Sequence, residues 1–359
     1  MVGMKMFSEI SLEPQALFGQ RKPEFQNFLK VLRRERPSRY TIFDFFLNDD
    51  LEGVIAGWDH EPVDENDKLV RRIEAFTKVG YDCVTIHASN YEFYHGENQH
   101  GKASVSVNEG AVVTDRESYE KYPWREPEDY YNGRLEYLAP FLPDGMKFLV
   151  YSPGGVLENV MAITGYDNLC YLLADDPELL EDLFHQVGSR LLRYYQQVVG
   201  LDCVGALISN DDWGFNTQTM LSGADMRKYV FPWHRKFVEL AHSHGKPIFL
   251  HSCGQLERVM DDVIDDLNFD GKHSYEDKIF PVEQAYDAWH DRIAIIGGID
   301  MDYVCRKSPE EIYNRCCQIL QQTGGVGYAL GSGNSVPYYV PYENYRAMVA
   351  AALCNEMEV

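Results

Sequence analysis

The sequence is short of positive charge. Its 359 residues hold 33 Lys and Arg against 56 Asp and Glu, which is a formal net charge of -23. This deficit argues against nucleic acid or an anionic membrane surface as a partner, because both attract basic proteins. No apolar run approaches the length of a membrane span, and the first residues lack the apolar segment and cleavage site of a secretory signal. Eight scattered cysteines form no disulfide framework, which indicates reduced thiols and a cytoplasmic protein.

The composition is that of a globular protein, with 45% hydrophobic and 25% charged residues. Eight short apolar runs alternate with helical patterns, and this alternation predicts a (β/α)8 barrel. The runs span residues 40–46, 83–86, 146–151, 203–208, 247–250, 269–272, 293–296 and 326–330. We expect one barrel domain over residues 1–359. Because such barrels need only about 250 residues, the surplus predicts an N-terminal helical extension (1–39) and a lid insertion (88–144) after the second strand.

The fifth run ends in His251-Ser252-Cys253. Residues two apart on a strand point to the same side, so these two side chains aim at one point where the strand surfaces. Imidazole nitrogen and thiolate sulfur are ligands that zinc prefers. The alternative interpretation is a buried core cysteine beside a hydrogen-bonded histidine, since cysteine is commonly a small buried hydrophobe.

Other strand ends also carry polar or aromatic groups. In (β/α)8 barrels the chemistry lies at the carboxyl ends of the strands, so we expect these residues to share one rim with His251 and Cys253. Trp213 and Phe215 form either an apolar wall for a small ligand or packing beneath the lid. The candidates are His87, Asp211, Asp212, Trp213, Phe215, His273, Glu276, Ser332 and Asn334.

Four segments resemble the uroporphyrinogen decarboxylase superfamily, which includes zinc-dependent, corrinoid-linked methyltransferases. They are residues 250–254 (LHSCG), 295–300 (IIGGID), 327–334 (GYALGSGN) and 341–344 (PYEN). The resemblance runs from about residue 36 to the C-terminus and implies a (β/α)8 barrel. In the methyltransferase branch a His-x-Cys at the end of strand five supplies two zinc ligands, so the resemblance implies that His251 and Cys253 bind zinc.

The chain departs from the decarboxylase branch in two segments. Residues 45–50 (FFLNDD) are acidic, where the decarboxylases carry arginines that hold substrate carboxylates, and residues 87–90 (HASN) show no clear counterpart of the decarboxylase aspartate. A porphyrinogen with eight carboxylates would be repelled by the acidic segment. We therefore expect no activity on uroporphyrinogen.

The chain also departs from the thiol-methylating branch, whose third zinc ligand is a cysteine after strand eight. Here that position holds Ser332 or Asn334. The ligand set then needs further donors from neighbouring strand ends, and oxygen donors would leave the ion more Lewis-acidic than thiolates do. The candidates for this role, or for moving a proton, are Asp211, Asp212, His273 and Glu276.

These features predict a cytoplasmic, zinc-dependent methyltransferase that moves a methyl group between a small substrate and cobalamin on a separate corrinoid protein docked over the mouth. His87, Trp213, Phe215, Ser332 and Asn334 are expected to line the substrate site. One rival is a lyase that decarboxylates a smaller carboxylate. The other is a barrel that binds a ligand or partner without catalysis. The sequence leaves open the methyl donor, the direction of transfer and the oligomeric state.

Overall fold

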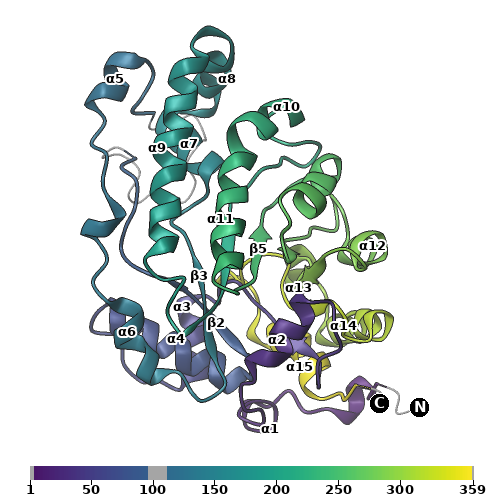
Figure 1. Ribbon diagram of the computed structural model, residues 1–359. Helices are drawn as coiled ribbons and strands as arrows, with labels where there is room; N and C mark the ends of the chain where they lie inside the picture. Colours follow the sequence, from purple (N-terminus) through teal and green to yellow (C-terminus); the bar gives the residue numbers. More distant parts are fainter. Residues whose placement is uncertain (1–3, 96–110, 358–359) are drawn as a thin grey trace.

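Eight parallel strands form one curled sheet in the computed structural model, which describes residues 4–95 and 111–357. The strand order is β1-β8-β7-β6-β5-β4-β3-β2, and Figure 1 labels β2, β3 and β5 of this sheet. The strands are β1 Thr41–Ile42, β2 Cys83–His87, β3 Lys147–Tyr151, β4 Val204–Asn210, β5 Ile248–His251, β6 Gly271–His273, β7 Ala294–Ile296 and β8 Tyr328–Leu330. Each overlaps one of the eight predicted runs, so the predicted (β/α)8 fold is confirmed.

Helices alternate with these strands, and several begin where the sequence carries capping signals. Asp176 precedes Pro177 and accepts a hydrogen bond from the Leu179 amide, which starts α9. Among the described residues no helix is both long and apolar enough to cross a membrane. The helices are α1 Pro14–Leu17, α2 Phe25–Leu32, α3 Asp49–Ala56, α4 Glu65–Val79, α5 Arg116–Lys121, α6 Arg134–Leu138, α7 Val156–Thr164, α8 Tyr166–Asp175, α9 Pro177–Gln196, α10 Gly223–Asp225, α11 Phe231–Ser243, α12 Val282–Trp289, α13 Met301–Arg306, α14 Pro309–Thr323 and α15 Tyr342–Leu353.

The N-terminal extension closes the end of the barrel at which the strands begin. Phe249 of β5 and Phe43, which directly follows β1, belong to a small inner core that is separate from the larger core between strands and helices. Helix α2 contributes Phe28 to this inner core, with its ring centroid 5.8 Å from Phe43 and 6.0 Å from Phe249. Because α2 closes the end where the strands start, only the carboxyl ends of the strands are left for a site.

The barrel wall has a seam between β1 and β2. No backbone ladder joins these two strands, whereas a ladder joins every other neighbouring pair in the described sheet. Side chains bridge the seam instead. The Thr85 hydroxyl donates to the carbonyl of Phe45 (2.5 Å), and the Tyr81 hydroxyl donates to Asp44.

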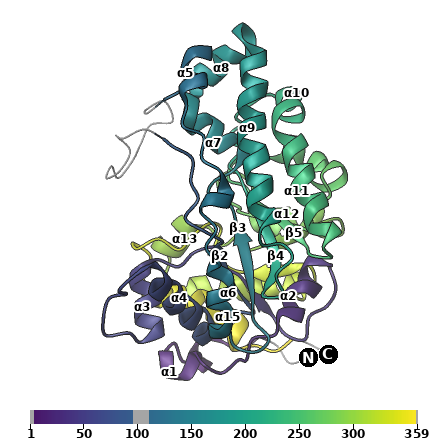
Figure 2. The same ribbon diagram turned by 60° about the vertical axis from the view of Figure 1, so that its left-hand side comes forward.

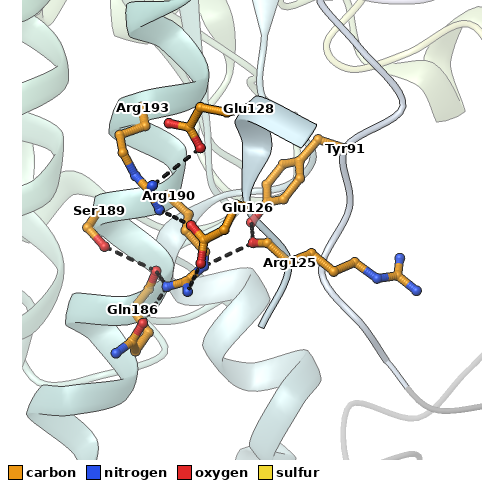
Figure 3. A network of polar contacts seen from close by, with 8 residues as sticks. All are labelled: Tyr91, Arg125, Glu126, Glu128, Gln186, Ser189, Arg190 and Arg193. Carbon is orange, nitrogen blue, oxygen red and sulfur yellow. Dashed lines mark hydrogen bonds and ion pairs between the residues drawn. The ribbon is translucent and has the colours of Figure 1, made fainter. Parts of the chain in front are cut away.

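The described part of the lid insertion packs against α9. It includes α5, which lies near α8 at the far end of the molecule (Figure 2), and α6, which contacts α4. Arg190 of α9 donates to Glu126 (2.6 Å) and to the carbonyl of Arg125 (3.0 Å), and Arg193 also binds Glu126 (Figure 3). The guanidinium of Arg190 lies 4.8 Å from the ring centre of Trp124. Residues 96–110 of the predicted lid lie outside the described residues.

Candidate functional site

The ends of β4, β5 and β6 lie side by side. The sheet register pairs Asn210 with His251 and His251 with His273. The loops that follow β4 and β5 then touch at Gly214 and Gly254. A Cβ at Gly254 (φ +85°) would lie 2.2 Å from the Gly214 carbonyl oxygen, so only glycine permits this approach. The glycine contact brings the loop that carries Asp212 against the loop that carries Cys253.

Three potential metal ligands meet there. Asp212, His251 and Cys253 each offer a ligand atom, and these atoms lie within 4.8 Å of one another. The Cys253 amide donates to Asp212 Oδ1 at 2.8 Å, which fixes the two loops in register. The ligand atoms of a tetrahedral zinc site lie about 3.5 Å apart, so small side-chain rotations would close this group around an ion. The donor set of one carboxylate, one imidazole and one thiol fits zinc.

Hydrogen bonds and burial affect Cys253 and His251, two of the three candidate ligands. The Cys253 sulfur accepts hydrogen bonds from Ser274 Oγ (3.3 Å) and Asn334 Nδ2 (3.2 Å). Burial, and then the Asp212 charge, raise the pKa of the Cys253 thiol, while burial lowers the pKa of His251 to about 4. The imidazole is therefore neutral at pH 7, and an ion must displace the thiol proton before it binds. Asn334, one of the two residues that could stand in the place of the third cysteine, contacts the sulfur as a hydrogen-bond donor.

Asp211 lies outside this group although it is the neighbour of Asp212. Its fully buried carboxylate accepts hydrogen bonds from the Leu157 and Glu158 amides (both 3.0 Å) at the start of α7, and it contacts His234 Nε2 at 2.9 Å. All three partners are donors when His234 carries a proton on Nε2. The side chain thus ties the first turn of α7 to the end of β4.

The two aromatic candidates, Trp213 and Phe215, do not belong to the metal group. Trp213 is fully buried, with its ring 5.1 Å from Phe231 and 4.8 Å from His234. Phe215 is 39% exposed and packs against Tyr166, 5.6 Å away between ring centres. Both positions match packing contacts more closely than a wall around the three ligands.

His273 lies directly behind His251. Its Nδ1 is 2.7 Å from Nδ1 of His251, and its Nε2 is 3.2 Å from the carbonyl oxygen of Ser332. Burial, and then His251, lower the pKa of His273 well below its ordinary value. His273 therefore contacts a candidate ligand but is not one of the three grouped side chains.

His87 lies inside the mouth on the opposite side of the barrel. Its ring centre is 3.9 Å from that of Tyr151, and its Nδ1 is buried without a hydrogen-bond partner among the described residues. Burial, and then the charges of Arg72 and Arg134, lower the pKa of His87 to about 3. Two cations therefore stand near the end of β2, one from α4 and one from α6.

An open cleft of about 470 Å³ reaches the metal group at Cys253. Cys253, Asn334 and Glu276 form part of its wall, and Tyr339 also lines the cleft. Burial, and then Asp300, raise the pKa of Glu276. Glu276 is thus placed along the cleft rather than among the grouped ligands.

A model of the uroporphyrinogen decarboxylase (URO-D) family matches residues 149–353, which is more than half of the chain. The chain belongs to the uroporphyrinogen decarboxylase family. Among solved structures, a methyltransferase from Methanosarcina mazei is similar, with a TM-score of 0.68, 15% identity, and coverage of 92% of this chain and 98% of that one. Xylanase XynB from Paenibacillus barcinonensis has a TM-score of 0.41 at 11% identity, with coverage of 75% and 81%. No curated protein matches the sequence. At 15% identity the methyltransferase likeness shows a shared fold.

This member of the uroporphyrinogen decarboxylase family carries two further titratable groups close to Asp212, which are Glu158 and Lys272. Glu158, in the first turn of α7, has its pKa raised well above the ordinary value by burial and then by Asp212 and Asp211. Lys272 of β6 is 3% exposed, and burial lowers its pKa to about 8. The sequence signal for Glu158 is Gly155 three residues earlier, since the Gly155 amide donates to the Glu158 carboxylate at 2.9 Å.

Proposed function

We propose that this family member is a zinc-dependent methyltransferase that moves a methyl group between a small substrate and a separate corrinoid protein. The observation that carries the proposal is the grouping of Asp212, His251 and Cys253 within 4.8 Å at the carboxyl ends of neighbouring strands. The similar fold of the methyltransferase from Methanosarcina mazei supports the same class of reaction.

Each residue of the proposed site has a separate role. Asp212, His251 and Cys253 would hold the ion. When bound, zinc supplies a Lewis acid that polarises the bond between the methyl group and its carrier atom. Phe45 stacks on His251 with ring centres 4.4 Å apart and keeps water from that side. Burial and the neighbouring Asp212 raise the pKa of Glu158, which favours a proton on this carboxyl close to Asp212.

The corrinoid partner is proposed to dock over the mouth, with the lid insertion as part of its contact surface. The whole chain, residues 1–359, is proposed to act as one domain. A cytoplasmic location agrees with the eight cysteines, none of which is paired in a disulfide.

The first test is elemental analysis of protein purified without added metal. We expect about one zinc per chain, loss of the metal in Cys253→Ala, and retention in Cys170→Ala, where an exposed thiol on α8 serves as the matched control. Full zinc occupancy in Cys253→Ala would overturn the site.

The second test is anaerobic methyl transfer. Cob(I)alamin is incubated with the zinc-loaded protein and small methyl ethers, methanol or methylamines, and the cobalt spectrum is followed. We expect methylation that depends on Cys253. If none of these compounds methylates cobalt, and if no cobalamin-containing protein is captured from native extract, the methyltransferase proposal fails.

A second candidate is a lyase that decarboxylates a small carboxylate. Arg134 favours it, because this guanidinium is 4% exposed, donates only to the side chain of Asn90, and forms no ion pair within residues 4–95 and 111–357. A buried cation without an anion is costly, and a substrate carboxylate would supply one. Carbon dioxide release by metal-free protein would favour this candidate. Conversion of uroporphyrinogen to coproporphyrinogen would contradict both readings of the site.

A further inference from the structure

The contact between His251 and His273 restricts where their protons lie. The two Nδ1 atoms are 2.7 Å apart, and the rings stack at 29° with centres 4.9 Å apart. Two nitrogens at this distance share one proton, because two N–H groups cannot face each other in a hydrogen bond. One histidine therefore donates from Nδ1 and the other accepts.

Ser332 decides which ring accepts. Its carbonyl oxygen lies 3.2 Å from Nε2 of His273 and already accepts the Gly298 amide at 3.0 Å. A carbonyl oxygen can only accept, so Nε2 of His273 carries hydrogen. A neutral His273 then has a bare Nδ1, and His251 must donate to it from its own Nδ1. Nε2 of His251 is left with a free lone pair, which is what a metal requires.

We infer that His273 is a positioning residue that selects the metal-binding tautomer of His251. The opposite proton arrangement would place hydrogen on Nε2 of His251 and leave it no lone pair for an ion. His273 thus acts from behind the ligand, as outer partners of metal-bound histidines do. The inference rests on the proposed metal site but does not depend on which reaction that site performs.

The main chain holds this arrangement in place. The Ser332 amide donates to Asp44 Oδ1 at 2.8 Å, which orients the Ser332 peptide. Gly297, with φ +67°, leaves room for the ring. A Cβ there would lie 2.4 Å from the Ser332 carbonyl oxygen and 2.9 Å from Nε2 of His273. The chain of contacts therefore runs from Asp44 through Ser332 and His273 to His251.

The direct test is the tautomer of His251 in metal-free protein. Proton–nitrogen correlation spectra of 15N-histidine-labelled protein distinguish hydrogen on Nδ1 from hydrogen on Nε2, and a His251→Gln sample assigns the signals. We expect His251 to carry hydrogen on Nδ1 in the wild type. Hydrogen on Nε2 would overturn the inference, and this measurement does not need an active enzyme.

Variants supply the second measurement. His273→Leu removes the acceptor, and we expect the affinity for Co²⁺, used as a probe of the zinc site, to fall about 10- to 100-fold. His273→Asn restores an acceptor near the position of Nδ1 and should recover most of that loss. His242→Leu is the matched control, because His242 pairs with Asp270 instead (2.9 Å). Unchanged Co²⁺ affinity in a folded His273→Leu protein would refute the positioning role, whereas absent methyl transfer with the expected tautomer would refute only the proposed reaction.

Discussion

The adjacent residues Asp211 and Asp212 should give opposite phenotypes when each is replaced by alanine. Asp211 is fully buried and serves two backbone amides of α7 and the His234 ring. Its removal leaves three buried donors without an acceptor, and each costs about 1–3 kcal/mol. We expect Asp211→Ala to lower the free energy of unfolding by about 4 kcal/mol, near the low end of that sum because water can enter the space.

Asp212→Ala should leave stability nearly unchanged. The Asp212 side chain is half-buried, and its one hydrogen bond to a protein amide, that of Cys253, is worth about 1 kcal/mol. Its loss removes one of three proposed ligands, so zinc affinity should fall by more than the roughly 10- to 100-fold typical of an outer partner.

Urea unfolding of the metal-free proteins measures the first quantity, and competition with a chromophoric zinc chelator measures the second. The folded fraction of Asp211→Ala should still bind zinc with an affinity close to that of the wild type. If Asp211→Ala keeps full stability and loses zinc, or if Asp212→Ala unfolds and keeps zinc, the assignment of the two carboxylates is reversed.

Three other features give testable outcomes. Burial raises the pKa of Asp44 from 3.8 to about 6, so its protonated form stabilises the fold below about pH 4 and this contribution is lost as the pH rises to 6. The free energy of unfolding of Asp44→Asn, measured relative to that of the wild type, should therefore rise by about 3 kcal/mol between pH 4 and pH 7. An equal difference between the two proteins at both pH values, measured by urea titration, would contradict this. Phe28→Ala opens a cavity at the base of the barrel and should cost about 3–5 kcal/mol by urea unfolding, with zinc content unchanged; a loss of zinc would mean that the plug shapes the mouth. Arg190→Ala removes the contacts to Glu126 and the Arg125 carbonyl, so hydrogen exchange near Glu126 should quicken by about tenfold or more while β5 keeps its protection, and unchanged exchange there would show that the lid is held by other contacts.

The strands were predictable because each buried strand of the barrel is a short run of apolar residues in the sequence. The pattern could not show that β1 lacks a ladder to β2, since that depends on how the curled sheet meets itself. Nor could it show that Phe28 of the N-terminal extension fills the barrel. An amphipathic helix has an apolar face wherever it packs, and the sequence does not say against what.

The candidate site was predictable in part. The sequence predicted that His251 and Cys253 lie together. The strand β5 ends at His251, so Cys253 joins it from the following loop, and the structure adds Asp212 to the two residues. The choice between Asp211 and Asp212 depends on the backbone after β4, where strand alternation no longer applies. Glu158 was missed because its capping contact with Gly155 looks like an ordinary helix start.

The electrostatics of the mouth were the least predictable part. The acidic segment after β1 begins α3, where Asp49 binds Lys68 at 2.8 Å, so part of its charge is neutralised. Cations come instead from helices, because Arg72 and Arg134 both act on His87 at the end of β2. Strand-end residues alone do not reveal side chains that reach the mouth from outside the barrel wall.

The seam between β1 and β2 makes the barrel wall mechanically uneven. Every other junction in the described sheet must break backbone hydrogen bonds to widen, whereas this one needs only side chains such as Thr85 and Tyr81 to move. β5 lies three strands from β2 and four from β1 around the sheet, so His251 stands on the stiff wall opposite the seam. A bulky guest can therefore spread the mouth on one side while the three ligands on the other side keep their spacing.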